Sequence, residues 1–348
     1  MGFSLKKKSA TAQWEYEKEQ QRAEFDKREV QTGLSRSRPI QDSPSFAYPP
    51  PAPHSPQKVP QNFGAPPTPE FLSGIAVCVL NAGRFERQES GSDVLDCVAV
   101  AAQFGVDLLH SHPGFKALTK TGAQILMRAS SRNIRCRDPI QAPSHAADYL
   151  RRITDAFPVI AVHNLKAMNA RTNKGRWEVP QDRMFPPHHA AVIELNLNLV
   201  GRLVEARNSV RHQRNDQNAW ERLHTLLFRI GVTIAHELCH VFTSYLLYNE
   251  RQHTPKEVTY AAEYSSDTVG ESGRFWESET FGGYVDMRQG SRIERVAIRH
   301  GTRTLSNVMI IPPSFCRAML KRGKYSIPPR PQGPSTSYRQ VELVLTAV

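Results

Sequence analysis

Apolar residues recur every three or four positions along residues 216–248, the strongest periodic pattern in the chain. This spacing predicts one long helix with an apolar stripe that packs into a core. Gly231 lies in this segment, although a glycine inside a helix costs about 1 kcal/mol relative to alanine. We therefore expect another backbone to approach the helix closely there. The stripe consists of Trp220, Leu223, Leu227, Ile230, Ile234, Leu238, Val241 and Tyr245.

Shorter patterns predict further helices and strands, which together indicate an α+β fold with a small mixed sheet. Helices are expected at residues 92–109, with Ser92 or Asp93 as the cap, and at 144–156, 197–208 and 314–320. Strands are expected at 71–80, 124–129, 158–163, 189–196, 293–298 and 308–311. The polar segments 169–187 and 252–261 are predicted to be loops, and glycines bracket a short segment at 270–283.

Composition divides the chain into three parts. Residues 36–69 are dense in proline and poor in apolar residues, and residues 10–30 are charged. Such segments bury too little surface to offset their ordering entropy, so residues 1–70 are predicted to be a disordered tail. Residues 71–327 form the predicted domain, and 328–348 a loose end. The PxxP spacing at 50–53 and 66–69 fits the aromatic grooves of partner modules, the alternative being a passive linker.

The formal net charge is +12, and the chain has five scattered cysteines. A positive surface fits acidic partners or nucleic acid. Because the arginines are not interleaved with aromatic residues, nucleic acid is the less favoured partner. Unpaired cysteines are typical of a reducing compartment. No secretory signal or membrane span is predicted, so we expect an intracellular protein of the cytoplasm or nucleus.

The long predicted helix contains the pattern His-Glu-Leu-Cys-His at residues 236–240. Residues four apart lie on the same helix face, so His236 and His240 can bind one metal ion together. Glu237, between them, lies close enough to act on a water molecule at that ion. Cys239 points away from the histidines and is expected to be buried. The pattern predicts one zinc ion per chain.

A catalytic zinc site needs a third protein ligand, and the next dense group of carboxylates downstream is Glu271, Glu277 and Glu279. Glu277 is the preferred candidate because Phe275, Trp276 and Phe281 surround it and can anchor a short helix against the motif helix. Glu271, in a turn at the start of that helix, and Glu279 remain alternatives.

These residues resemble the zincin superfamily of metallopeptidases in its gluzincin arrangement, with His-Glu-x-x-His on one helix and a glutamate on the next. The resemblance covers residues 192–283. It departs from the thermolysin-like Asn-Glu signature because Trp276 stands in place of the asparagine. The metzincin continuation is absent, since Thr243 and Leu246 occupy its positions, and so is the third histidine of Spartan-like nuclear proteases. The strand at 191–196 looks like the edge strand that binds zincin substrates.

The resemblance implies a zinc metallopeptidase that hydrolyses peptide bonds in a protein or peptide substrate, with Glu237 as general base. Tyr264, Tyr284 and His253 are candidate stabilisers of the oxyanion, and Asp267 is a candidate partner of a ligand histidine. Two alternatives remain open. One is a catalytically inactive zincin-fold protein that binds zinc and serves in interaction or regulation. The other is a basic protein in which the motif is incidental.

Overall fold

The computed structural model describes residues 72, 75–129, 134–166, 168–174, 185–248, 253–260, 269–289, 294–301 and 306–322. All of them belong to the unit Pro50–Val348. The predicted tail at 1–70, its proline-rich segments and the end at 328–348 lie outside the described residues. Within the described part, the fold is α+β as predicted, with one five-stranded and one three-stranded sheet.

The five-stranded sheet is mixed and has the order β2-β1-β3-β5-β4. Its central strands β1 (Val77–Asn81), β3 (Val159–His163) and β5 (Ala191–Asn196) are parallel. The outer strands β2 (Arg84–Arg87) and β4 (Ala170–Lys174) are antiparallel to their neighbours. The second sheet is an antiparallel meander of β6 (Tyr284–Gln289), β7 (Glu294–Gly301) and β8 (Ser306–Ile311).

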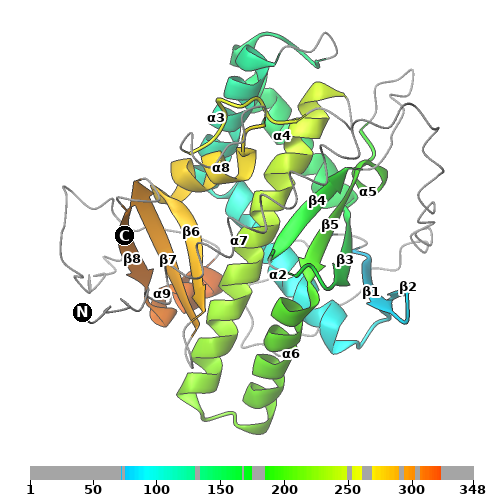
Figure 1. Cartoon of the computed structure of the whole chain (residues 1–348), viewed down its shortest axis with the longest axis vertical. Coiled ribbons are helices and arrows are strands. Elements are labelled where there is room, and N and C mark those ends of the chain that lie inside the picture. Colours follow the sequence, from blue (N-terminus) through cyan, green and yellow to red (C-terminus); the bar gives the residue numbers. More distant parts are fainter. Residues whose placement is uncertain are drawn as a thin grey trace, which may run out of the picture. The chain divides into compact units, whose positions relative to one another are not determined.

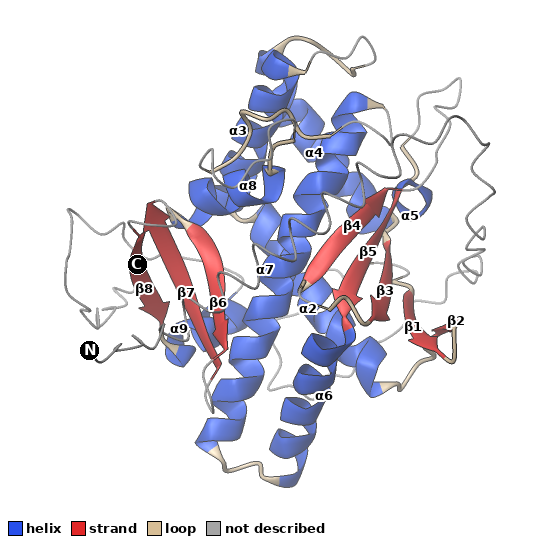
Figure 2. Ribbon diagram, viewed as in Figure 1, coloured by secondary structure: helices blue, strands red, loops and turns tan. Residues whose placement is uncertain are grey.

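Helices supply most of the core residues, and Figure 2 shows how these helices are arranged around the two sheets. They are α2 (Asp93–His110), α3 (His112–Arg128), α4 (Ala142–Asp155), α5 (Pro187–Ala190), α6 (Leu197–His212), α7 (Gln217–Leu247), α8 (Ser272–Phe281) and α9 (Pro313–Arg322), with a short 3-10 helix at Pro139–Gln141. Side chains cap several of them, and Ser92 was expected to be a cap from the sequence. The Ser92 hydroxyl accepts from the Leu95 backbone at the start of α2, and the Asp216 carboxylate accepts from the Asn218 backbone at the start of α7.

Helix α7 is the predicted motif helix, and it runs between the two sheets (Figure 1). It packs against α2, α6, α8 and α9 and also touches β4, β5 and β7. Among the described residues, α7 is the one helix that is by itself long and apolar enough to cross a membrane. Helices α2 and α3 would be long and apolar enough only if they were taken together as one span, bent by 73°. The apolar window of α7 is, however, mostly buried inside the fold, as in the core helix of a folded domain.

The predicted close approach at Gly231 is confirmed. A Cβ atom at Gly231 would lie 2.3 Å from Cδ1 of Phe104 in α2, and one at Gly105 would lie 2.7 Å from the carbonyl oxygen of Gly231. The two helices therefore cross backbone to backbone at a pair of glycines, which explains why α7 tolerates glycine in its interior.

Three sequence predictions about the sheets and α3 are wrong. Residues 124–129 were expected to form a strand, but almost all of them are the last turns of α3. The expected loop at 169–187 contains β4. Strand β5, expected to be the edge strand, lies between β3 and β4, because β4 adds to it and becomes the edge.

Candidate metal centre

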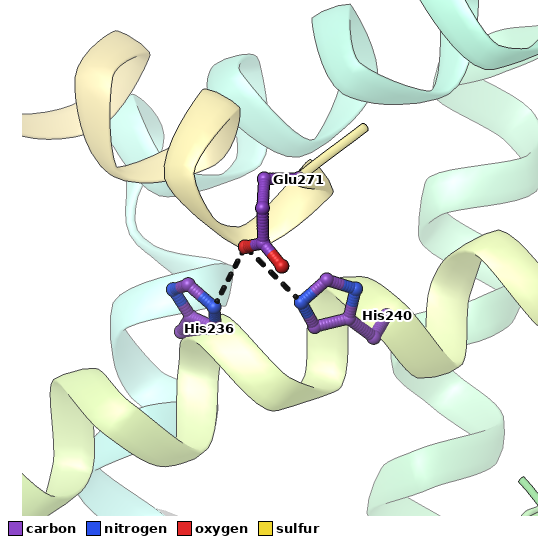
Figure 3. Close-up of side chains that lie close together, drawn as sticks. All are labelled: His236, His240 and Glu271. Atoms are coloured by element: carbon purple, nitrogen blue, oxygen red, sulfur yellow. Dashed lines mark ion pairs between the residues drawn. The ribbon is translucent and has the colours of Figure 1, made fainter. Parts of the chain in front are cut away.

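The two motif histidines lie one turn apart on α7 with both rings on the same side of the helix (Figure 3). Their ring centroids are 5.2 Å apart. The helix around them is almost wholly buried, whereas the side chains of His236 and His240 keep 13% and 16% of their surface exposed. Cys239, between them, is buried and its thiol donates to the Ala235 carbonyl, as expected of a residue that faces the core. The helix thus presents two imidazoles toward a partly open space.

Glu271 completes a cluster of possible metal ligands with these histidines (Figure 3). It occupies the position just before α8. Its Oε2 atom lies 3.3 Å from Nε2 of His236 and 3.5 Å from Nε2 of His240. Ligand atoms about 2.0–2.1 Å from a tetrahedral ion must be roughly 3.3–3.4 Å apart. The two distances from Glu271 to the histidines therefore fit a zinc-sized ion.

Gly273 allows α8 to approach the face of α7 that carries His236 and His240. A Cβ atom at this position would lie only 2.4 Å from the ring of His236. The preceding loop is fixed by backbone hydrogen bonds, since the Glu271 amide donates to the Val258 carbonyl and the Gly270 amide to the Thr254 carbonyl. The glycine and these two bonds together place the Glu271 carboxylate above the two histidines.

Glu277, the preferred third ligand in the sequence analysis, lies outside this cluster. Its Oε1 atom is 2.6 Å from Nδ1 of His236, the nitrogen on the far side of the ring from Glu271. Its Oε2 atom accepts from Arg274 at 2.9 Å and from the Val285 amide at 2.8 Å. The geometry therefore corrects the choice of third residue: Glu271, not Glu277, groups with Nε2 of both histidines, and Glu277 contacts the opposite nitrogen of His236.

Nδ1 of His240 is contacted by a hydroxyl group instead of a carboxylate. Its Nδ1 atom lies 3.2 Å from the hydroxyl of Ser272. That hydroxyl also bonds to the hydroxyls of Thr243 and Thr254, each at 3.2 Å. All three hydroxyl residues are buried. One ligand histidine is thus held by a carboxylate and the other by neutral hydroxyls.

The carboxylates make the cluster attractive to positive charge. Burial lowers the pKa of His236, but the charges of Glu277 and Glu271 outweigh burial and raise that pKa to about 10. Burial raises the pKa of Glu271, but His240 and His236 outweigh it and hold that pKa well below its usual value. A proton therefore resides on His236 when no metal is bound, and a divalent cation can replace it.

Glu237 lies beside the cluster without belonging to it. The residue is buried, and its Oε2 atom accepts a hydrogen bond of 2.8 Å from the hydroxyl of Thr172 on β4. Its carboxylate is therefore held toward β4 and takes no part in the cluster of His236, His240 and Glu271. Sequence analysis missed Thr172, because residues 170–174 carry no apolar alternation that would have marked a strand.

The remaining candidates lie elsewhere. Glu279 pairs with Lys120 of α3 at 2.7 Å. His253 is exposed, and Tyr284 is buried under the guanidinium of Arg274. Tyr264 and Asp267 lie outside the described residues.

Comparison with known proteins gives no family for this chain: no family model, no curated protein and no solved structure matches it.

Proposed function

We propose that the chain is a zinc-dependent peptidase of zincin-like architecture that acts on proteins or peptides. The observation that carries the proposal is that ligand atoms of His236, His240 and Glu271 lie within 4.8 Å of one another. Glu237 follows His236 in the chain and is not part of this cluster, and its carboxylate accepts a hydrogen bond from Thr172. Two histidines and one carboxylate with an open fourth position are the donor set of catalytic zinc in peptidases.

The ion would be held by Nε2 of His236, Nε2 of His240 and a carboxylate oxygen of Glu271. When bound, zinc acidifies a water molecule and polarises a carbonyl group. Glu237 accepts the proton of the attacking water and later delivers it to the leaving amine. Glu277 accepts a hydrogen bond from Nδ1 of His236, which leaves Nε2 of that ring for the metal, and the hydroxyl of Ser272 contacts Nδ1 of His240.

Strand β4 supports a peptide as the substrate. It is an edge strand, so its outer backbone groups can pair with an extended chain. Its middle residue, Thr172, contacts Glu237, which places this edge next to the proposed base. A peptide paired with β4 would therefore pass beside the metal centre.

The cysteines support a reducing compartment as part of this proposal. All five are free, and four of them are buried. A domain that keeps its thiols unpaired is typical of the cytoplasm or nucleus.

The test compares wild type with Glu237→Gln and with the double variant His236→Ala, His240→Ala. Wild type is expected to carry close to one zinc per chain, and the double variant none. Glu237→Gln should keep its zinc, whereas its hydrolysis of lysate proteins, followed by the new peptide termini that appear, should fall at least about 100-fold.

The same experiment separates the alternatives. Zinc binding without any new termini in wild type would support a non-catalytic zinc protein. Full zinc occupancy in the double variant would refute the site itself.

A further inference from the structure

We infer that Thr172 is a positioning residue that orients the carboxylate of Glu237 toward the metal centre. The inference rests on the proposed function, because it assigns a role to Glu237 as base. It adds a second element to the site: the base is supplied by α7 but is oriented by the edge strand β4.

The contact between the two residues is short and close to the helix backbone. The Thr172 hydroxyl lies 2.8 Å from Oε2 of Glu237 and 3.0 Å from the carbonyl oxygen of the same residue. A hydroxyl has one proton to donate, so these two acceptors share it. The bond to the ionised carboxylate is the stronger of the two, and it holds Oε2 against β4. Oε1 accepts no hydrogen bond from the described residues, so in the proposed reaction it is the oxygen left to accept the proton of the water.

The strand that carries Thr172 is itself fixed on its other face. Successive side chains of a strand point to opposite faces, so Arg171 and Asn173 point away from α7. Both donate to the buried carboxylate of Glu194 on β5, which also contacts His163 on β3. Arg171 and Asn173 therefore anchor β4 to β5 and β3 on either side of Thr172. A hydroxyl on so restrained a strand can impose an orientation on its partner rather than follow it.

This arrangement links substrate docking to the base. A peptide that pairs with the outer edge of β4 would bind to the same strand that orients Glu237. The hydroxyl of Thr172 bonds only to Glu237 among the described residues, and to none of the three ligand residues. Its removal should therefore affect the base without affecting the affinity for metal.

The experiment uses Thr172→Val, which removes the hydroxyl but keeps the branched shape, and Thr172→Ser, which keeps the hydroxyl. The full-length proteins are loaded with cobalt(II) in place of zinc, because its visible absorption reports ligands at the metal. Acetohydroxamate is the probe. It binds a metal through its two oxygens, and its polar hydrogens donate to a neighbouring carboxylate, so its affinity reports the position of Glu237 without any hydrolysis.

Cobalt affinity is expected to be the same in all three proteins. Acetohydroxamate should bind about five- to tenfold more weakly to Thr172→Val, the loss that corresponds to one ordinary hydrogen bond, and nearly as tightly to Thr172→Ser as to wild type. Glu237→Ala sets the upper limit of the effect.

Equal acetohydroxamate affinities in wild type and Thr172→Val would overturn the inference. So would an equal loss in both variants, because the hydroxyl would then not be the cause. Either result leaves the proposed function standing. A wild-type protein that takes up no cobalt would instead overturn the proposed metal centre, and this inference with it.

Discussion

Nδ1 of His236 lies 2.6 Å from Oε1 of Glu277, and this contact determines which ring nitrogen faces Glu271. With Nδ1 engaged by a buried carboxylate, Nε2 is the nitrogen directed toward the ligand cluster. The two glutamates of α8 and its cap thus act on opposite sides of one imidazole, which gives them separable roles.

Substitution of these two glutamates should distinguish ligand from support. Glu271→Gln removes an anionic metal ligand, and the affinity for zinc should fall by more than 100-fold. Glu277→Gln keeps a hydrogen-bond acceptor behind His236 but removes its charge, so affinity should fall by about 10- to 100-fold. Competition with a chromophoric chelator measures both. If Glu277→Gln lost more affinity than Glu271→Gln, the assignment of the third ligand would return to Glu277.

Gly273→Ala should abolish metal binding. The added methyl group would lie 2.4 Å from the His236 ring, so either the ring or the start of α8 must move. Metal sites tolerate displacements of only a few tenths of an ångström, and we expect near-complete loss of zinc by elemental analysis. The matched control is Gly201→Ala, since a Cβ atom there meets nothing within 4 Å. The control should keep its zinc and gain up to about 1 kcal/mol of stability.

Gly231→Ala should destabilise the fold without touching the ligands. Its Cβ atom would lie 2.3 Å from the Phe104 ring and 3.1 Å from the Ala101 carbonyl oxygen, so α2 and α7 must separate. Overpacking of this kind costs about 1–3 kcal/mol, which urea denaturation monitored by circular dichroism can measure. A melting temperature equal to that of wild type would show that the glycine crossing is not tight.

Asp107→Asn should stabilise the protein at neutral pH. Burial raises the pKa of Asp107 to about 6, against a small opposing effect of the hydrogen bond from Gln103. The folded state therefore holds a proton that the unfolded state releases near pH 4. The stability that this proton contributes is present below pH 4 and is lost as the pH rises through 6.

Asparagine removes the charge and retains an acceptor for Gln103. Well above pH 6, Asp107→Asn should be more stable than wild type by about 3 kcal/mol, and below pH 4 the two should be equal. Denaturation curves at pH 4 and 7.5 test this sign. An equal difference at both values would exclude titration of Asp107 as its cause.

The sequence predicts those elements whose signals are local. Helices α2 and α7 carry helical periodicity and a capping Ser92 or Asp216, and both form as expected. The prediction of a strand at residues 124–129 was wrong because a short apolar run fits a strand and the end of a helix equally well. The start of that helix, capped by Ser111, lies upstream of the run. Strand β4 has no apolar alternation because it is an edge strand with charged and polar side chains.

The candidate metal centre also has one feature that a local sequence signal predicts and one that depends on tertiary packing. The i, i+4 spacing of His236 and His240 is local, and it places both rings on one face. The choice between Glu271 and Glu277 depends on which nitrogen of His236 faces the open side, and only the packing of α8 against α7 decides it. Aromatic neighbours identified Glu277 correctly as a residue held in a packed environment, but such packing suits a supporting carboxylate as well as a ligand.

A metal ion at this centre would also be a cross-link. His240 and Ser272, the residue next to Glu271, are 32 positions apart in the chain. An ion that joins the two segments closes a loop of about this size, much as a disulfide would, and so reduces the entropy of the unfolded chain. Binding to the folded state alone adds further stability as the free metal concentration rises. The lifetime of the folded domain would then depend on the supply of metal, so a cell short of zinc would lose the protein itself as well as its activity.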